Sequence, residues 1–251
     1  DQLLTERVRD FSFLPAWMLQ RWYLLRAAER PDDLLRFEPE FRALALRIIP
    51  DRPGIPLIIS ASTHARVGDL PTARALLRRL HDSRELWPEP MWCFFLGEPC
   101  FRVGDPVVAR RAYELLLPRA ECFFQSGFAG VCTGPPNNQA LGLLALTLGQ
   151  PATAVAHLQS ALAASEASGL RGELPRLRYE CALALRRRGH TGDAGSARAL
   201  LVSARELACE LAQGGLIPDL DAELAELAER TERTERTERA ELAAGAAGSL
   251  R

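Results

Sequence analysis

Apolar residues recur at helical spacing along most of the chain, and prolines and glycines divide this pattern into short segments. The clearest segment is 137–164. Four of its apolar residues fall at i, i+3, i+4 and i+7 and share one helix face: Leu141, Leu144, Ala145 and Leu148. The spacing returns after Gly149-Gln150-Pro151, where glycine suits the end of one helix and proline the first turn of the next. The segment predicts a helical hairpin, which needs further hairpins to bury its apolar face.

Four turns align when their glycines are placed at the same point: Gly68, Gly104, Gly149 and Gly192. The shared pattern is G-[D/Q]-x-x-x-A, at intervals of 36, 45 and 43 residues. Glycine permits the tight turn, Asp or Gln can cap the second helix, and the small alanine lets that helix approach its partner closely. Four residues after each alanine comes a larger apolar residue on the same face: Leu77, Tyr113, Leu158 and Leu201. These copies predict a repeated helix–turn–helix unit.

The residues between Leu117 and Asn137 do not follow the repeat. Three glycines and the pair Pro135-Pro136 argue against one continuous helix there. We predict an irregular insert at residues 118–136, with a short helix from Cys122 to Phe128 followed by a loop.

The C-terminal part of the chain changes in composition. A final helix is expected near Pro218, with a narrow leucine stripe that caps the last repeat. Residues 229–239 are built on Thr-Glu-Arg, with Glu–Arg pairs at i, i+4, and predict a solvated, partly frayed helix. Residues 243–251 predict a disordered tail. We therefore divide the chain into a repeat domain, 1–217, and a C-terminal region, 218–251.

At the aligned turns the chain resembles the tetratricopeptide repeat (TPR) family, whose 34-residue unit contains a similar turn. Gly97 and Gly142 match the small residue inside the first helix of that unit, and Ala161 and Ala204 match the small residue late in the second. The resemblance implies an all-α fold, a right-handed α-solenoid of TPR-like helical hairpins with turns near residues 68, 104, 149 and 192.

A second resemblance concerns the parent protein. Leu117-Pro118, the run from Gly130 to Pro135, and the segment from Leu141 to Gly149 are similar to divergent repeats at the C-terminal end of large bacterial regulators. Those regulators place a signal-transduction ATPase before the repeats, sometimes with an adenylate cyclase or a LuxR-type or SARP-type DNA-binding domain. The resemblance implies that this chain is a segment of a larger, cytoplasmic protein.

Composition narrows the classes of partner. The 251 residues include 31 basic and 32 acidic side chains, for a net charge of −1, and every basic residue is arginine. This balance gives no reason to expect a nucleic-acid or membrane partner. No run approaches the roughly 18 apolar residues that a transmembrane helix needs. We interpret the short arginine runs as solvated helix faces.

The sequence offers little catalytic chemistry. A Walker A motif is impossible without lysine, and no G-x-G-x-x-G follows a strand. Cys93 and Cys100 share a predicted helix face, but a zinc site would need two more ligands. His157 lies on an apolar face, where a packing role is expected. We predict no catalytic residue, no metal and no cofactor.

The remaining candidate for a functional site is a surface groove. In TPR arrays the first helix of each repeat lines a concave groove. Alignment to the turn glycines places seven candidate contact residues in that groove: Arg66, Phe94, Glu98, Arg102, Gln139, Tyr179 and Arg187. The resemblance implies a non-enzymatic interaction or regulatory sensor module whose partner is a protein, a peptide or a neighbouring domain of the same polypeptide. Two alternatives stay open: a small-molecule or enzymatic site in the irregular segment 122–136 that involves Cys132, and a structural spacer that promotes self-association.

Overall fold

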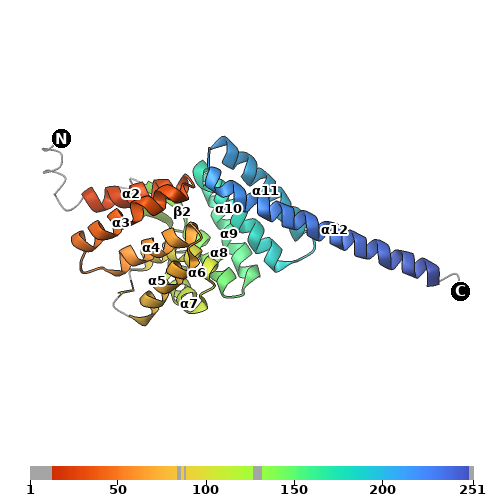
Figure 1. Cartoon of the computed structure of the whole chain (residues 1–251), viewed down its shortest axis with the longest axis horizontal. Coiled ribbons are helices and arrows are strands. Elements are labelled where there is room, and N and C mark those ends of the chain that lie inside the picture. The colour runs from red at the N-terminus through yellow and green to blue at the C-terminus, as the bar shows by residue number, and fades with distance from the viewer. Residues whose placement is uncertain (1–12, 84–85, 88, 127–131, 249–251) are drawn as a thin grey trace.

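Helical hairpins pack in chain order, with one β-hairpin between them, in a computed structural model that describes residues 13–83, 86–87, 89–126 and 132–248 (Figure 1). Before the β-hairpin come α2 (Phe13–Ala27), α3 (Pro31–Ile48), α4 (Gly54–Arg66), α5 (Leu70–Asp82), α6 (Gly97–Val103) and α7 (Pro106–Leu116). The strands are β1 (Phe123–Ser126) and β2 (Cys132–Pro136). After them come α8 (Asn138–Thr147), α9 (Pro151–Ala167), α10 (Leu174–Arg188), α11 (Asp193–Glu210) and α12 (Ile217–Gly248). The 3₁₀ turns among the described residues are η2 (Pro90–Leu96), η3 (Leu117–Arg119), η4 (Arg171–Glu173) and η5 (Gly214–Leu216).

The glycines of the four predicted turns share one backbone geometry. Each glycine has a positive φ, which only glycine adopts at low cost: 85° at Gly68, 72° at Gly104, 72° at Gly149 and 86° at Gly192. The alanine five residues after each glycine is fully buried between the two helices of its hairpin: Ala73, Ala109, Ala154 and Ala197. In each repeat the glycine therefore permits the turn, and the alanine permits the close approach of the two helices of the hairpin.

Aspartate caps the second helix in two of these turns. The Asp69 carboxylate accepts a hydrogen bond from the backbone N–H of Thr72, and the Asp105 carboxylate accepts one from Val108. Gln150 makes no such bond, so the α8–α9 turn depends on its glycine and on Pro151 at the start of α9.

The two interior glycines lie where neighbouring helices nearly touch. A methyl group on Gly97 of α6 would stand 2.9 Å from the Cα atom of Ala140 in α8. A methyl group on Gly142 would stand 2.4 Å from the side chain of Leu158 in α9. Glycine thus sets how closely α6, α8 and α9 approach one another.

Helix α8 is the centre of the molecule, and its residues from Asn138 to Leu146 are all buried. Leu141 and Leu144 belong to a hydrophobic core formed with α2 to α7. Leu143 and Leu146 belong to a second core formed with α9 to α12. A helix that is apolar on all sides joins the two halves of the fold.

The irregular insert differs from the prediction of a helix at 122–128, because residues 123–126 form a strand. This strand pairs antiparallel with β2, which ends in Gly-Pro-Pro, a sequence that favours extended backbone. Phe124 points inward and stacks on Tyr23, with ring centroids 5.5 Å apart. Gly134 also lies against Tyr23. Phe124 and Gly134 of the insert therefore pack in the core, while Cys122 and Thr133 are exposed, and residues 127–131 of the alternative ligand site lie outside the described residues.

The C-terminal region forms one helix. Helix α12 runs from Ile217 to Gly248, so it covers the final helix expected near Pro218 and the solvated helix expected at 229–239. Residues 243–248, for which a tail was expected, are also helical. Ala, Glu, Arg and Leu, which dominate α12, have high helix propensity, and ion pairs such as Arg236–Glu232, at 3.3 Å, add support along one face. Leu220 and Leu227 pack into the second core, and the rest of α12 extends away from the body (Figure 1).

The close approach of α6 and α8 can be tested with Gly97→Ala. The added methyl group meets backbone that cannot move aside freely, so we expect the free energy of unfolding to fall by about 1–3 kcal/mol in urea denaturation. Gly195→Ala in α11 is the matched control. That site is open, so the control is expected to gain about 0.5–1 kcal/mol. A Gly97→Ala variant as stable as the control would contradict the packing described here.

Candidate functional site

Charged and polar side chains from six parts of the chain meet in one buried cluster. The buried ones come from the α2–α3 turn and from the first helices of successive hairpins: Glu29, Arg66 in α4, Glu98 in α6, Gln139 in α8, and Arg176 and Glu180 in α10. Asp219 of α12, 35% exposed, lies at the edge of the cluster. We call Glu29, Arg66, Glu98 and Arg176 the ionic network.

Glu29 is the centre of the ionic network. Arg176 binds it through two parallel hydrogen bonds, Nε to Oε1 at 2.9 Å and Nη2 to Oε2 at 2.7 Å. Arg66 Nη1 donates to the same carboxylate at 2.8 Å. Glu29 has a φ of 52°, a left-handed conformation that costs about 1–2 kcal/mol for a residue other than glycine. The strained turn directs the carboxylate toward both guanidinium groups.

The protonation of these carboxyls follows from their surroundings. Burial alone would raise the pKa of Glu29, but attraction to Arg176 and Arg66 outweighs it and lowers the pKa from 4.5 to about 2. Glu98 behaves in the same way, since Arg66 and Arg102 hold its pKa well below the usual range despite burial. Both carboxylates are therefore ionised at neutral pH.

The start of α12 closes the cluster from the other side. Arg102 Nη2 donates to Asp219 Oδ2 at 3.1 Å, and Arg176 Nη1 lies 3.8 Å from the same oxygen. The amide of Gln213 donates to the backbone carbonyl of Ala27, at 2.8 Å. The first hairpin, α10 and the α11–α12 junction are therefore held together by direct polar contacts.

A small hollow of about 110 Å³ opens beside the ionic network; we call it the inner hollow. Its apolar walls are Phe101, Leu143 and Leu183. Its polar lining comes from α6 and α10: Glu98, Arg102, Arg176, Tyr179 and Glu180. Ligand sites typically combine apolar walls with a few convergent polar groups, as this hollow does.

Glu180 differs from the buried carboxyls Glu29 and Glu98, which are paired with arginines. It is 3% exposed, and no arginine of the described residues lies within ion-pair distance of it. Its hydrogen-bond donor is the amide of Gln139, at 2.8 Å, whose own oxygen Oε1 is buried and has no partner among the described residues. Burial raises the pKa of Glu180 to about 7, because the attraction of Arg176 does not offset the loss of water.

Five of the seven predicted groove residues lie in or beside the inner hollow. Glu98, Arg102 and Tyr179 line it. Gln139 lies beside the hollow and donates a hydrogen bond to Glu180, which lines it. The exposed Arg187 stacks on the ring of Phe101, another lining residue, with its guanidinium carbon 4.7 Å from the ring centre.

The other two predicted residues lie deeper. Arg66 is buried within the ionic network, and Phe94 packs in an aromatic cluster with its ring 5.2 Å from that of Phe124. Alignment to the turn glycines selects one position per helix turn, and it missed Arg176 and Glu180. Their sequence signal is weak: it is a pair of opposite charges at i, i+4 that shares a helix face, in a stretch that also carries Arg178.

Two other candidate groups have structural roles. His157 shares hydrogen bonds with the Tyr113 hydroxyl, at 2.9 Å, and the Asn138 amide oxygen, at 2.7 Å, which confirms its packing role. Cys93 is buried, and desolvation raises the pKa of its thiol to about 12. No group of three or more His, Cys, Asp or Glu side chains in the described ranges is arranged to hold a metal ion.

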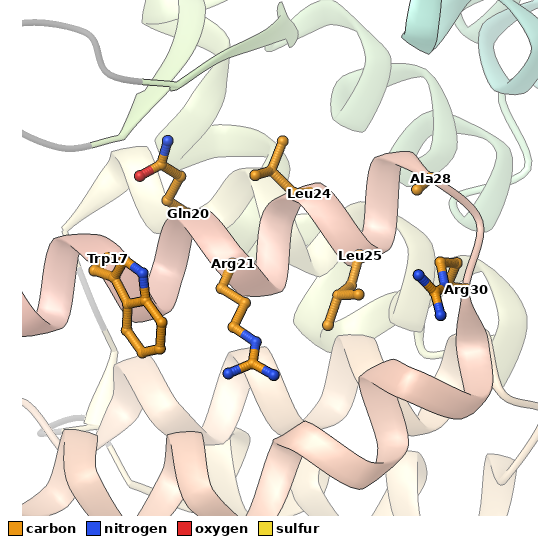
Figure 2. Close-up of a pocket in the computed structure, with 7 residues that line it drawn as sticks. All are labelled: Trp17, Gln20, Arg21, Leu24, Leu25, Ala28 and Arg30. Atoms are coloured by element: carbon orange, nitrogen blue, oxygen red, sulfur yellow. The ribbon is translucent and has the colours of Figure 1, made fainter. Parts of the chain in front are cut away.

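A second, open hollow of about 480 Å³ runs along the outside of α2 and the turn after it (Figure 2). Trp17 and Leu24 are half exposed there, at 48% and 55%, and the guanidinium of Arg21 lies between Trp17 and Phe37. Its described lining residues all come from one helix and its turn, so no other described element faces them across the hollow. The inner hollow, built from several helices, is the better-formed site.

Comparison with known families supports the repeat. A tetratricopeptide repeat family model matches residues 57–79 and 140–160, which are the α4–α5 and α8–α9 hairpins. No curated protein and no solved structure matches the chain. The chain therefore contains a TPR-like region, and such repeats are generally protein-interaction modules and typically non-enzymatic. In the part of the chain that is described, no helix combines the length and apolar character needed to cross a membrane.

The buried Glu180 can be tested through the pH dependence of stability. Its pKa is higher in the folded chain, about 7, than in the unfolded chain, about 4.5, so its ionisation disfavours folding progressively as pH rises between these values. Glu180→Gln removes that cost. We expect the variant to be more stable than the wild type at pH 8, by at most about 3 kcal/mol, and no different at pH 4. Urea denaturation at both pH values checks this.

The exposed Glu114→Gln is the control and should change little at either pH. A Glu180→Gln variant that is less stable than the wild type at pH 8 would show that the ionised carboxylate is well solvated or ion-paired, contrary to this description.

Proposed function

We propose that this chain is a non-catalytic protein-interaction and regulatory module, a right-handed α-solenoid of TPR-like hairpins that binds a partner segment or small effector in the inner hollow. The observation that carries the proposal is the convergence of five groove candidates on that hollow, three of them in its lining. The repeat-family match supports it, because TPR arrays generally bind other proteins.

The contacts of α12 support a sensing role. Asp219, at the start of α12, is bonded to Arg102, which lines the inner hollow. A ligand that engages Arg102 competes with this contact or reinforces it, so its affinity differs between a chain in which Asp219 is bonded to Arg102 and one in which that bond is broken. Such differential binding is what a ligand needs in order to shift a conformational equilibrium. The part of α12 that extends away from the body (Figure 1) then passes the change to a neighbouring module.

The wider setting is part of the same proposal. We propose that the module belongs to a large bacterial regulator of the transcriptional or nucleotide-cyclase type. In this setting it acts in the cytoplasm on a protein, a peptide or a neighbouring domain of the same polypeptide. The support is the resemblance of the insert and of the α8–α9 hairpin to the repeats of those regulators.

A peptide-display selection against the whole chain tests the binding role. Selected peptides are then titrated against Arg187→Glu, which reverses an exposed charge at the mouth of the inner hollow, and against Arg110→Glu, which reverses an exposed charge on α7. We expect a tenfold or larger loss of affinity with Arg187→Glu and little change with Arg110→Glu. Peptides that bind both variants equally well would place the binding surface elsewhere.

A further inference from the structure

The charged groups that line the inner hollow are not equally satisfied by the protein. Arg176 is held by Glu29, and Arg102 is bonded to Asp219 through Nη2 and lies 3.3 Å from Glu98 through Nε. No described residue accepts a hydrogen bond from Nη1 of Arg102, whose side chain is 25% exposed. Glu180 has an amide donor but no cationic partner among the described residues. The hollow thus offers one guanidinium edge and one carboxyl to a ligand.

The charge balance of the cluster restricts what can enter. Four arginines face four carboxyls: Arg26, Arg66, Arg102 and Arg176 with Glu29, Glu98, Glu180 and Asp219. The cluster is neutral when Glu180 is ionised. A ligand with a single charge would leave one uncompensated charge in a buried setting, which is costly. A ligand that carries one positive and one negative group keeps the balance and gives Glu180 its missing partner.

The volume of the hollow limits the size of the ligand. Its 110 Å³ is the volume of about four water molecules at roughly 30 Å³ each, and it is below the roughly 300–1,000 Å³ of sites that hold cofactors or drug-sized ligands. Phe101, Leu143 and Leu183 form a wall suited to a small apolar group. A ligand that fits the charge, volume and apolar wall of this hollow is a small zwitterion with a short apolar substituent.

From this combination we propose that the inner hollow binds a free α-amino acid with a small apolar side chain. Its ammonium group contacts Glu180, its carboxylate contacts Arg102, and its side chain lies against Phe101, Leu143 and Leu183. The proposal rests on the proposed function, since it names the effector for the same hollow.

The proposal also explains why position 180 carries a buried carboxyl and not an uncharged side chain. In the unliganded chain this carboxyl receives one amide hydrogen bond, and burial raises its pKa to about 7, so we expect its ionisation to oppose folding as pH rises. Glutamine would have nearly the same shape without that cost. A group that is retained against stability in a cavity is typical of a binding site, where the ligand supplies the missing interaction.

Isothermal titration calorimetry of the whole chain with glycine, L-alanine and L-valine tests the proposal. Propionate and ethylamine are titrated as analogues of alanine that each lack one charge. We expect saturable binding of at least one of the three amino acids and at least tenfold weaker binding of both analogues. Ethylamine that binds as tightly as alanine would overturn the proposal in favour of a simple ammonium site, and propionate that does so would overturn it in favour of an anion site.

Variants locate the site. Glu180→Gln and Arg102→Gln should each weaken amino-acid binding at least tenfold, about 1.4 kcal/mol. Glu114→Gln and Arg110→Gln, which change exposed residues of α7 in the same way, should leave it unchanged. Because Glu180→Gln is expected to be the more stable protein at pH 8, its loss of binding cannot be ascribed to unfolding. Equal binding by all four variants would overturn the assignment.

The two proposals can fail separately. If none of the amino acids binds while selected peptides still depend on Arg187, the amino-acid assignment is overturned and the interaction role stands. If amino acids bind with the expected dependence on Glu180 and Arg102 while no peptide depends on Arg187, the hollow is an effector site and the peptide-binding role is overturned.

Discussion

The carboxylate of Glu29, bound by Arg176 and Arg66, is the interaction on which the arrangement of this molecule depends. It joins a turn in the first hairpin to the first helix of the fifth hairpin, across 147 positions in sequence. All three groups are buried, so each would leave the others uncompensated if it were removed, at a cost of about 3–5 kcal/mol. Hydrophobic packing holds neighbouring hairpins together, and this ion pair specifies how the two ends of the array meet.

The same contact defines the inner hollow. With Arg176 held by Glu29, one side of its guanidinium borders the hollow, and Asp219 brings the start of α12 to its rim. Glu29 and Glu98 are paired with Arg66 and Arg176 or Arg102, so of the two carboxyls that line the hollow, Glu98 and Glu180, Glu180 is the one without an ionic partner among the described residues. A stable network and an unsatisfied group thus lie side by side, which is the combination expected when a rigid framework supports a binding site.

Much of the fold could be predicted from sequence, because its determinants are local. A glycine with positive φ, a capping aspartate and a small alanine recur within six residues, and the Gly68 and Gly149 turns lie within the segments that the repeat-family model matches. The β-hairpin could not be predicted in this way, because Phe124 is fixed by aromatic contacts with distant helices. The role of Glu29 could not be predicted for the same reason, since no neighbouring residue in the sequence indicates that its partner is Arg176 in α10. Glu98, Arg102 and Tyr179 of the inner hollow could be named from sequence, because their positions follow from the repeat register alone.

A double-mutant cycle on Glu29 and Arg176 tests the central claim most directly. Urea denaturation at pH 7 of Glu29→Gln, Arg176→Gln and the double variant gives the coupling energy, and a parallel cycle on the exposed pair Arg171–Glu210 serves as reference. The account predicts a coupling of about 3 kcal/mol or more for the buried pair, against about 0.2–1 kcal/mol for the exposed one. Single-variant effects that add within about 0.5 kcal/mol would contradict it, because the two ends of the array would then be held together by something else.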